Sequence, residues 1–338
     1  MSELLRNLAA CIRESHDPRV HVVTGSELAE DEPVALAAAT PKTASAEIVE
    51  PSGLIDPVPV GEPEAGRFGY FMDGMERQRV VLYYAGAPVV YGYTAAVIRT
   101  RGRDRRMRTH GAPVAREALF YPRRLVDLRL DGIDSVDTDD AEKPVEEHPM
   151  ILLDAARKKV SSVRDRLESR ATSEWLAAFD GGDDWLLVDG SLTGDYDHYA
   201  APNIVGVVKS HQTQYFPMEE QRKILGLRVG ERSGVFIPRG RRRPDVHSWY
   251  LRLRPNDGQD VHFGLVRVEA AGCDRTLAMA DEMSRWLLAE RSPLSLPDAR
   301  WDRMIYPIRD CEQYLRSLAP SRIMLDAALL RLGAVGSS

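Results

Sequence analysis

Residues 68–98 read FGYFMDGMERQRVVLYYAGAPVVYGYTAAVI and carry the strongest strand signal of the chain. Three apolar runs follow one another here, at 68–73, 79–84 and 89–98. They are rich in aromatic and β-branched residues, which favour strands. Asp73-Gly74 and Gly86-Ala87-Pro88 separate the runs, and both are typical turn sequences. We therefore predict a meander of three consecutive strands.

Outside this stretch, helix and strand signals alternate along the chain. Apolar residues recur at helical spacing in three segments, at 150–179, 275–290 and 307–331. Strands are predicted in four further segments, of which the last two form a hairpin: 185–189, 204–209, 246–254 and 261–269. This order predicts an α/β protein with a mixed sheet flanked by helices, and with an additional C-terminal hairpin and helices.

The first 66 residues have a different character from the rest. Residues 2–14 place Leu4, Leu5, Leu8 and Ile12 at helical spacing, so a short amphipathic helix is predicted. Its narrow apolar stripe suits docking to a partner, although packing on its own domain or on a second copy is also open. From Glu27 to Gly66 periodicity is lost, and we interpret this segment as a loosely structured connector.

The bulk composition restricts the class of protein. The 338 residues are 43% hydrophobic and 28% charged, as in a soluble globular protein. No apolar run approaches the roughly 20 residues of a membrane span, and the N-terminus lacks a signal peptide, so a cytoplasmic protein is expected. The three cysteines are far apart, which argues against a disulfide framework or a thiolate zinc site. A net charge of -6 fits an enzyme that holds metal with carboxylates better than a dedicated DNA-binding module.

Two aspartates each end an apolar strand and precede a glycine: Asp73 and Asp189. A single Asp-Gly step is usually a turn. Two acids at the ends of neighbouring buried strands, however, repel each other unless a cation lies between them. Carboxylate oxygens are the ligands that Mg²⁺ and Mn²⁺ prefer. The pair therefore predicts a metal site.

The helix over 150–179 supplies candidates for a third carboxylate: Asp165, Glu168 and Glu174. With that group the site would hold two cations, Mn²⁺ or Mg²⁺, which activate water and stabilise the leaving oxygen of a phosphodiester. Lys209 ends the apolar stretch IVGVVK. It either neutralises the scissile phosphate or is an ordinary solvated strand end.

Two basic runs, at 99–108 and 239–243, are candidate phosphate contacts, because arginine binds phosphate through two parallel hydrogen bonds. Few aromatic residues accompany the runs, so base stacking is not predicted there. The candidate DNA-binding residues are Arg103, Arg105, Arg106, Arg241, Arg242 and Arg243.

Four segments occur in order between Arg67 and Ala319: FGYFMDGMERQRVVLYYAGAPVVYGYTAAVIR, WLLVDGSL, NIVGVVKSHQTQYF and MIYPIRDCEQYL. Together they resemble the NurA nuclease family. The resemblance implies a ribonuclease-H-like nuclease domain over 67–331, preceded by the helix and connector of 1–66. It also implies Mn²⁺- or Mg²⁺-dependent cleavage of DNA, a symmetric homodimer, and a HerA-like hexameric ATPase as partner.

The resemblance also assigns roles to particular residues. Asp73 and Asp189 match the family's metal ligands, Glu168 its helical ligand, and Tyr306 its C-terminal catalytic tyrosine. The family often has a histidine eight residues after that tyrosine, where this chain has Tyr314. Either another residue, such as Asp310 or Glu312, replaces this ligand, or the register differs.

The function expected from the sequence is metal-dependent hydrolysis of DNA by two-metal-ion catalysis, in DNA end processing, repair or defence. One alternative is a catalytically silent DNA-binding or adaptor subunit of an ATPase translocase complex, which the Tyr314 departure suggests. Another is a ribonuclease-H-like activity on RNA or an RNA–DNA hybrid, although no RNA-binding module is recognisable.

Overall fold

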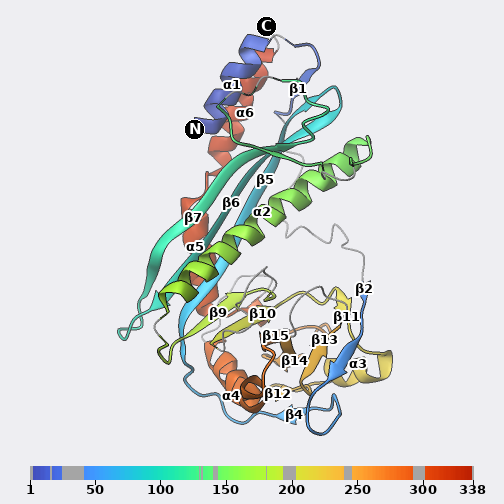
Figure 1. Cartoon of the computed structure of the whole chain (residues 1–338), viewed down its shortest axis with the longest axis vertical. Coiled ribbons are helices and arrows are strands. Elements are labelled where there is room, and N and C mark those ends of the chain that lie inside the picture. The colour runs from blue at the N-terminus through green and yellow to red at the C-terminus, as the bar shows by residue number, and fades with distance from the viewer. Residues whose placement is uncertain are drawn as a thin grey trace.

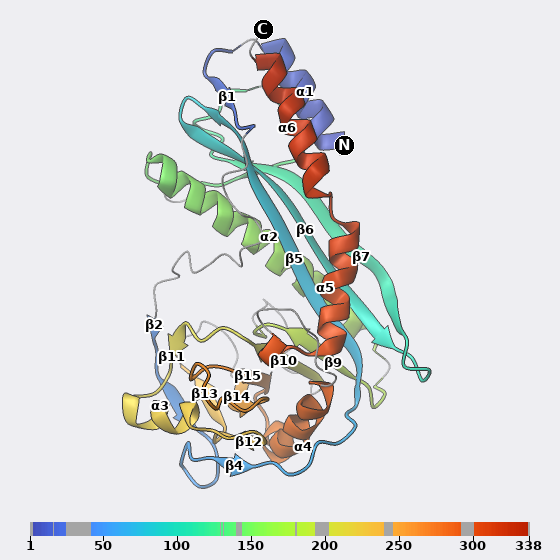
Figure 2. The ribbon, with the colours of Figure 1, turned by 180° about the vertical axis from the view of Figure 1, so that it is seen from behind.

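The molecule is elongated, and a twisted sheet runs through most of its length (Figures 1 and 2). The computed structural model describes the following residues: 3–15, 17–24, 42–128, 130, 132–139, 144–179, 181–192, 203–239, 246–291 and 301–336. Helices α1 (Glu3–Ser15) and α6 (Arg322–Gly336) lie side by side at one end, with both termini. The other end is a lobe of shorter strands with α3 (Met218–Leu225) and α4 (Asp274–Glu290).

The main sheet has thirteen strands within the described residues. Their order along the main path is β3-β13-β14-β15-β10-β9-β5-β6-β7-β8, and β1, β4 and β12 pair beside it. A separate pair is formed by β2 (Lys42–Thr43) and β11 (Thr213–Gln214). The bounds of the main-sheet strands are β1 Val20–Val22, β3 Ala46–Ile48, β4 Val58–Pro59, β5 Phe68–Tyr84, β6 Ala87–Arg101, β7 Met107–Tyr121, β8 Ser135–Asp137, β9 Trp185–Asp189, β10 Ile204–Val208, β12 Glu231–Arg232, β13 Phe236–Pro238, β14 Val246–Arg252 and β15 Leu265–Ala271.

The centre of the sheet combines antiparallel and parallel pairing. Strands β5, β6 and β7 form an antiparallel meander. Strand β9 adds to β5 in parallel, with Met72 opposite Val188, and β10 adds to β9 in parallel, with Val207 opposite Asp189. Strand β15 then pairs with β10 in the antiparallel direction. The sequence prediction of an α/β protein with a mixed sheet flanked by helices is confirmed.

Two helices cover opposite faces of the central strands. On one face α2 (Pro149–Ala178) packs Val160 and Trp175 against the sheet; His148 caps its first turn by accepting a hydrogen bond from the Met150 amide (3.2 Å). On the other face lies α5 (Tyr306–Leu318), which buries Ile308 and Leu315. None of the described helices combines the length and apolar character of a membrane span.

The predicted turn at Asp73-Gly74 is wrong. Strand β5 runs without interruption from Phe68 to Tyr84, and Asp73 pairs with Val97 in its interior. The first two predicted strands are therefore one strand, and the meander is completed by β7, which the sequence analysis did not predict. The basic run at 99–108 forms the end of β6, the connecting turn and the start of β7.

The connector interpretation is wrong for residues 42–66. This segment lies along the edge of the smaller lobe, where β3 pairs with β13 and β4 pairs with β12. Ile55 and Val60 in it are buried. The predicted helices over 150–179 and 275–290 are confirmed, whereas the helix over 307–331 is two helices, α5 and α6, separated at Pro320, which has no amide hydrogen for a helical bond.

Helix α1 forms as predicted, but its apolar stripe is already covered within the chain. Leu4, Leu5, Leu8 and Ile12 are buried, and they belong to the same hydrophobic core as Leu325 and Leu329 of α6. The suggestion that this stripe docks onto a partner is therefore wrong, and the open alternative of packing on its own domain holds.

We predict that Leu8→Ala lowers the free energy of unfolding by about 3 kcal/mol, because the fully buried side chain leaves a cavity when truncated. Arg6→Ala, at an exposed position of the same helix, is the control and should change stability by less than about 0.5 kcal/mol. Urea titrations measure both values. Equal midpoints for the two variants would show that α1 contributes nothing to the core.

Candidate active site

Strand alternation places three of the predicted site residues on one face of the sheet. Successive side chains of a strand point to opposite faces, so Asp73, Asp189 and Lys209 lie on the face of the preceding Phe71, Leu187 and Val207, respectively. Phe71, Leu187 and Val207 belong to the core cluster that includes Ile308 and Leu315 of α5. The three polar residues therefore face α5, at the point where β9 and β10 end beside β5.

Asp189 and Lys209 form an ion pair at these strand ends. Lys209 Nζ lies 2.8 Å from Asp189 Oδ1, and both side chains are mostly buried. Lys209 is therefore not an ordinary solvated strand end, which was one of the two interpretations of this residue from the sequence. Its charge compensates part of the negative charge that the neighbouring aspartates bring to the face.

Glu168 approaches the same place from the opposite helix, α2. A Cβ atom at Gly74 would clash with Glu168 Oε1, so the glycine leaves room for the carboxylate directly against β5. Gly74 is required here by close approach and not by a turn. Asp165 and Glu174 are more exposed and pair with Arg164 and Arg170 of their own helix. Of the three helical candidates, Glu168 is the one that lies against the Asp73-Gly74 segment.

The electrostatics of the group are those of crowded acids. Burial raises the pKa of Asp73 well above its usual value, and the negative charges of Asp189, Glu168 and Glu312 raise it further, while Lys209 opposes them. The amide of Gly74 donates a hydrogen bond to Asp73 Oδ1 (2.8 Å).

Glu168 shows the same effect in a milder form. Burial raises its pKa from 4.5 to about 7, although Arg164, whose Nε lies 3.2 Å from Glu168 Oε1, lowers it. The acids therefore share a poorly solvated place with two internal cations, Lys209 and Arg164.

The C-terminal residues of the predicted site separate into different environments. Asp310 accepts a hydrogen bond from Arg99 Nε (2.8 Å), and the Arg99 guanidinium lies over the Tyr314 ring at 4.5 Å from its centre. Glu312 is the acid of α5 whose negative charge helps to raise the pKa of Asp73. Tyr306 has a buried hydroxyl that interacts electrostatically with Arg254 of the smaller lobe, and it does not line the pocket that Lys209 and Glu312 share.

Three of the six predicted DNA-binding arginines lie in the described residues, and they are not part of this group. Arg103, Arg105 and Arg106 are exposed in the turn between β6 and β7, which projects at the margin of the molecule in Figures 1 and 2. Their neighbour Asp104 pairs with Arg108 (2.6 Å). The other basic run, with Arg241, Arg242 and Arg243, lies outside the described residues.

Sequence reasoning missed the residue that fixes the loop after Asp189. Glu269 in β15 is fully buried, and its Oε2 accepts hydrogen bonds from the Ser191 hydroxyl (2.6 Å) and the Leu192 amide (2.8 Å). Its other oxygen pairs with the buried Arg267. An acid within the apolar strand LVRVEAA is the signal that could have revealed it, because a buried charge needs a partner.

The carboxylates do not form a ready-made metal centre. Within the part of the chain that the structure describes, no three His, Cys, Asp or Glu side chains converge closely enough to hold an ion. The placement explains this, because Asp73 and Asp189 lie on the α5 face and Glu168 comes from α2. Any cation would have to replace or displace the internal positive charges of Lys209 and Arg164.

In comparisons with known proteins, no family model matches the chain and no curated protein is significantly similar to it.

The raised pKa of Glu168 predicts a pH-dependent stability. Its carboxyl binds a proton more tightly in the folded than in the unfolded protein, so the stability that it contributes is present below pH 4.5 and is lost as pH rises through about 7. Glu168→Gln has no carboxyl to titrate, so we expect its stability not to fall in this way. The melting temperature of Glu168→Gln relative to that of the wild type should therefore increase as pH rises from 4.5 to about 7.

Thermal melting in metal-free buffer at several pH values measures this difference. Glu174→Gln, at an exposed acid of the same helix, is the control and should follow the wild-type curve. A constant difference between Glu168→Gln and the wild type at all pH values would contradict the assigned burial of Glu168.

Proposed function

We propose that this protein is a metal-dependent DNA nuclease of the NurA type. The observation that carries the proposal is that the charges of Asp189 and Glu168, on a second strand and a helix, both act on the buried Asp73, with Lys209 paired to Asp189. Burial and the neighbouring acids raise the pKa of Asp73, and titratable groups perturbed in this way are common at functional sites. The motif resemblance supplies the reaction class.

The order of the central elements supports a ribonuclease-H-like core. That fold begins with three antiparallel strands, continues through a helix, and adds two further strands in parallel beside the first one. Here β5, β6 and β7 form the meander, α2 follows, and β9 and β10 add beside β5. On this proposal the strands β12 to β15 and helices α3 and α4 are additions that close the site from one side.

The donor set fits a hard divalent cation. Among the described residues, the groups proposed to hold it are carboxylates: Asp73, Asp189 and Glu168, with Glu312 on the facing helix. Oxygen ligands of this kind suit Mn²⁺ and Mg²⁺. When bound, two such ions supply a Lewis acid for the attacking water and for the leaving oxygen of a phosphodiester.

The chain's own residues have complementary tasks in this proposal. Lys209 holds Asp189 in place before substrate arrives and is positioned to neutralise a phosphate oxygen afterwards. Arg164 holds Glu168 against β5. Glu269 fixes the loop that follows Asp189 through Ser191 and Leu192, so the carboxylate stays aligned.

By the same resemblance, we propose a homodimer that works with a HerA-like hexameric ATPase in processing DNA ends. We do not propose helix α1 as the element that docks onto the ATPase, because α6 covers its apolar stripe.

A silent DNA-binding subunit is the second candidate. The observation in its favour is that Asp189 and Glu168 already carry internal cations, Lys209 and Arg164, in place of a preformed metal group. The two candidates differ in whether added Mn²⁺ displaces these pairs and produces cleavage.

We predict that Asp73→Asn and Asp189→Asn each lower Mn²⁺-dependent DNA cleavage by about two orders of magnitude or more, because each removes a ligand charge. Asp73→Asn should not lower the melting temperature of the metal-free protein, because it removes a crowded charge. Labelled single- and double-stranded DNA and RNA serve as substrates.

Glu174→Gln is the matched control, since it removes an exposed acid, and it should cleave like the wild type. Wild-type-like cleavage by Asp73→Asn would refute the site assignment. A wild-type protein that binds DNA but cleaves none of the substrates would favour the silent subunit.

A further inference from the structure

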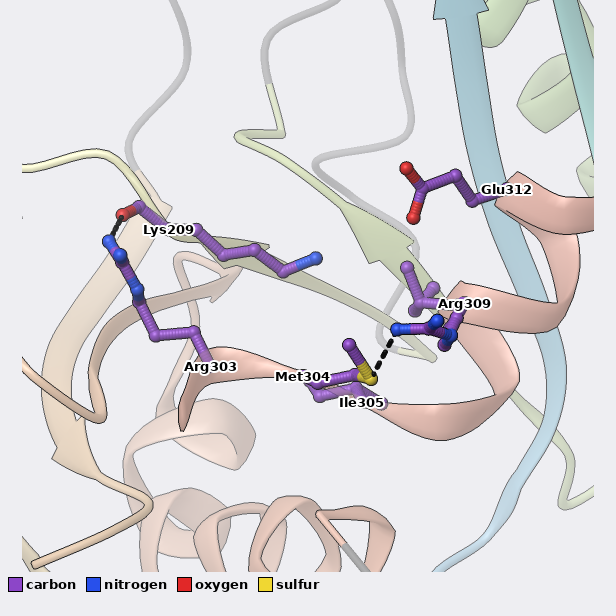
Figure 3. Close-up of a pocket in the computed structure, with 7 residues that line it drawn as sticks. Lys209, Arg303, Met304, Ile305, Arg309 and Glu312 are labelled. Carbon is purple, nitrogen blue, oxygen red and sulfur yellow. Dashed lines mark hydrogen bonds between the residues drawn. The ribbon is translucent and has the colours of Figure 1, made fainter. Parts of the chain in front are cut away.

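A small pocket lies beside the carboxylates, and its charged wall is mostly basic. Figure 3 shows Lys209, Arg303, Arg309 and Glu312 around it. Met304, Ile305 and Ile308 supply the apolar part of its lining. Three separate elements contribute: the end of β10, the short 3₁₀ helix Trp301–Arg303, and α5.

The pocket and the carboxylate group share two residues. Lys209 forms an ion pair with Asp189, and the negative charge of Glu312 raises the pKa of Asp73. In Figure 3 the amino end of Lys209 and the carboxylate of Glu312 extend toward the same space, with Arg309 beside it. A ligand in the pocket is therefore a direct neighbour of a group bound at the aspartates.

The two arginines that line the pocket contact different partners. Arg303 Nη1 donates to the carbonyl of Lys209 (3.1 Å), and its Nε lies 3.2 Å from the buried carboxylate of Asp302. Arg309 Nη1 donates to Sδ of Met304 (3.2 Å). Arg303 thus directs its guanidinium toward the Lys209 carbonyl, whereas Arg309 lies beside the amino end of Lys209 (Figure 3).

The chemistry of this wall suits a phosphodiester. Guanidinium groups bind phosphate oxygens through parallel hydrogen bonds, and the apolar residues beside them strengthen the attraction by excluding water. The acid of the pocket, Glu312, is compensated by Arg316, whose Nη2 lies 2.8 Å from Glu312 Oε1.

We propose that Arg309, beside the amino end of Lys209, forms a second phosphate subsite, which binds the phosphate next to the scissile one on the same nucleic-acid strand. This inference rests on the proposed nuclease function, since it takes the carboxylates as the place of cleavage. It assigns a phosphate contact to the pocket wall, in addition to the two basic runs at 99–108 and 239–243 that the sequence offered as candidate DNA contacts. A substrate with only one phosphate cannot use the subsite.

The test compares two substrates of the Mn²⁺-loaded protein: a single-stranded oligonucleotide and bis(p-nitrophenyl) phosphate, which has a single phosphodiester. We expect Arg309→Gln to lower kcat/KM for the oligonucleotide at least about tenfold more than for the small substrate. The slope of log affinity for the oligonucleotide against log salt should fall by about 0.7, which corresponds to one lost phosphate contact.

Arg6→Gln removes the same charge from an exposed position at the far end of the molecule and is the control. Equal losses on the two substrates, or no loss on either, would overturn the subsite. If the wild type hydrolyses neither substrate, the nuclease proposal fails, and the salt slope of oligonucleotide binding by fluorescence anisotropy still decides whether Arg309 contacts a phosphate.

Discussion

The structure has to accommodate the repulsion between acids that three separate elements bring close to one another. Asp73 is buried in the interior of β5, Asp189 ends the neighbouring strand, and Glu168 reaches Gly74 from α2. Burying charges in this way costs stability unless positive charge is close. In the protein alone, Lys209 and Arg164 supply it. The central strands and the two covering helices carry or cover these acids, and the glycine at 74 leaves room for Glu168.

The topology explains how residues far apart in the sequence meet. Parallel pairing of β5, β9 and β10 puts the ends of β9 and β10 at the same level of the sheet, next to Asp73. Helix α5 then covers this face and adds Glu312, while the adjoining 3₁₀ helix adds Arg303 to the same pocket. The carboxylates and the basic residues of the pocket are thus adjacent, and Lys209 contacts both groups.

Much of the fold could be predicted from the sequence, because helical periodicity and apolar runs are local signals. The exceptions depend on tertiary contacts. Asp73-Gly74 has the composition of a turn, but its glycine makes room for Glu168, and a residue 94 positions away leaves no local trace. The choice of Glu168 among three helical acids, the role of Glu269 and the position of Glu312 likewise depend on which elements pack together. The basic turn at 103–106 was visible in the sequence, whereas the pocket arginines are isolated in it.

The central proposal is that Asp73, Asp189 and Glu168 bind divalent cations when Lys209 and Arg164 are displaced. The most direct measurement is the anomalous difference map of a crystal soaked in Mn²⁺. We predict a peak in contact with oxygens of Asp73 and Asp189, and Lys209 Nζ moved away from Asp189 Oδ1, to which it is now 2.8 Å. A map without a peak at these aspartates, in a crystal where Lys209 still pairs with Asp189, would contradict the account.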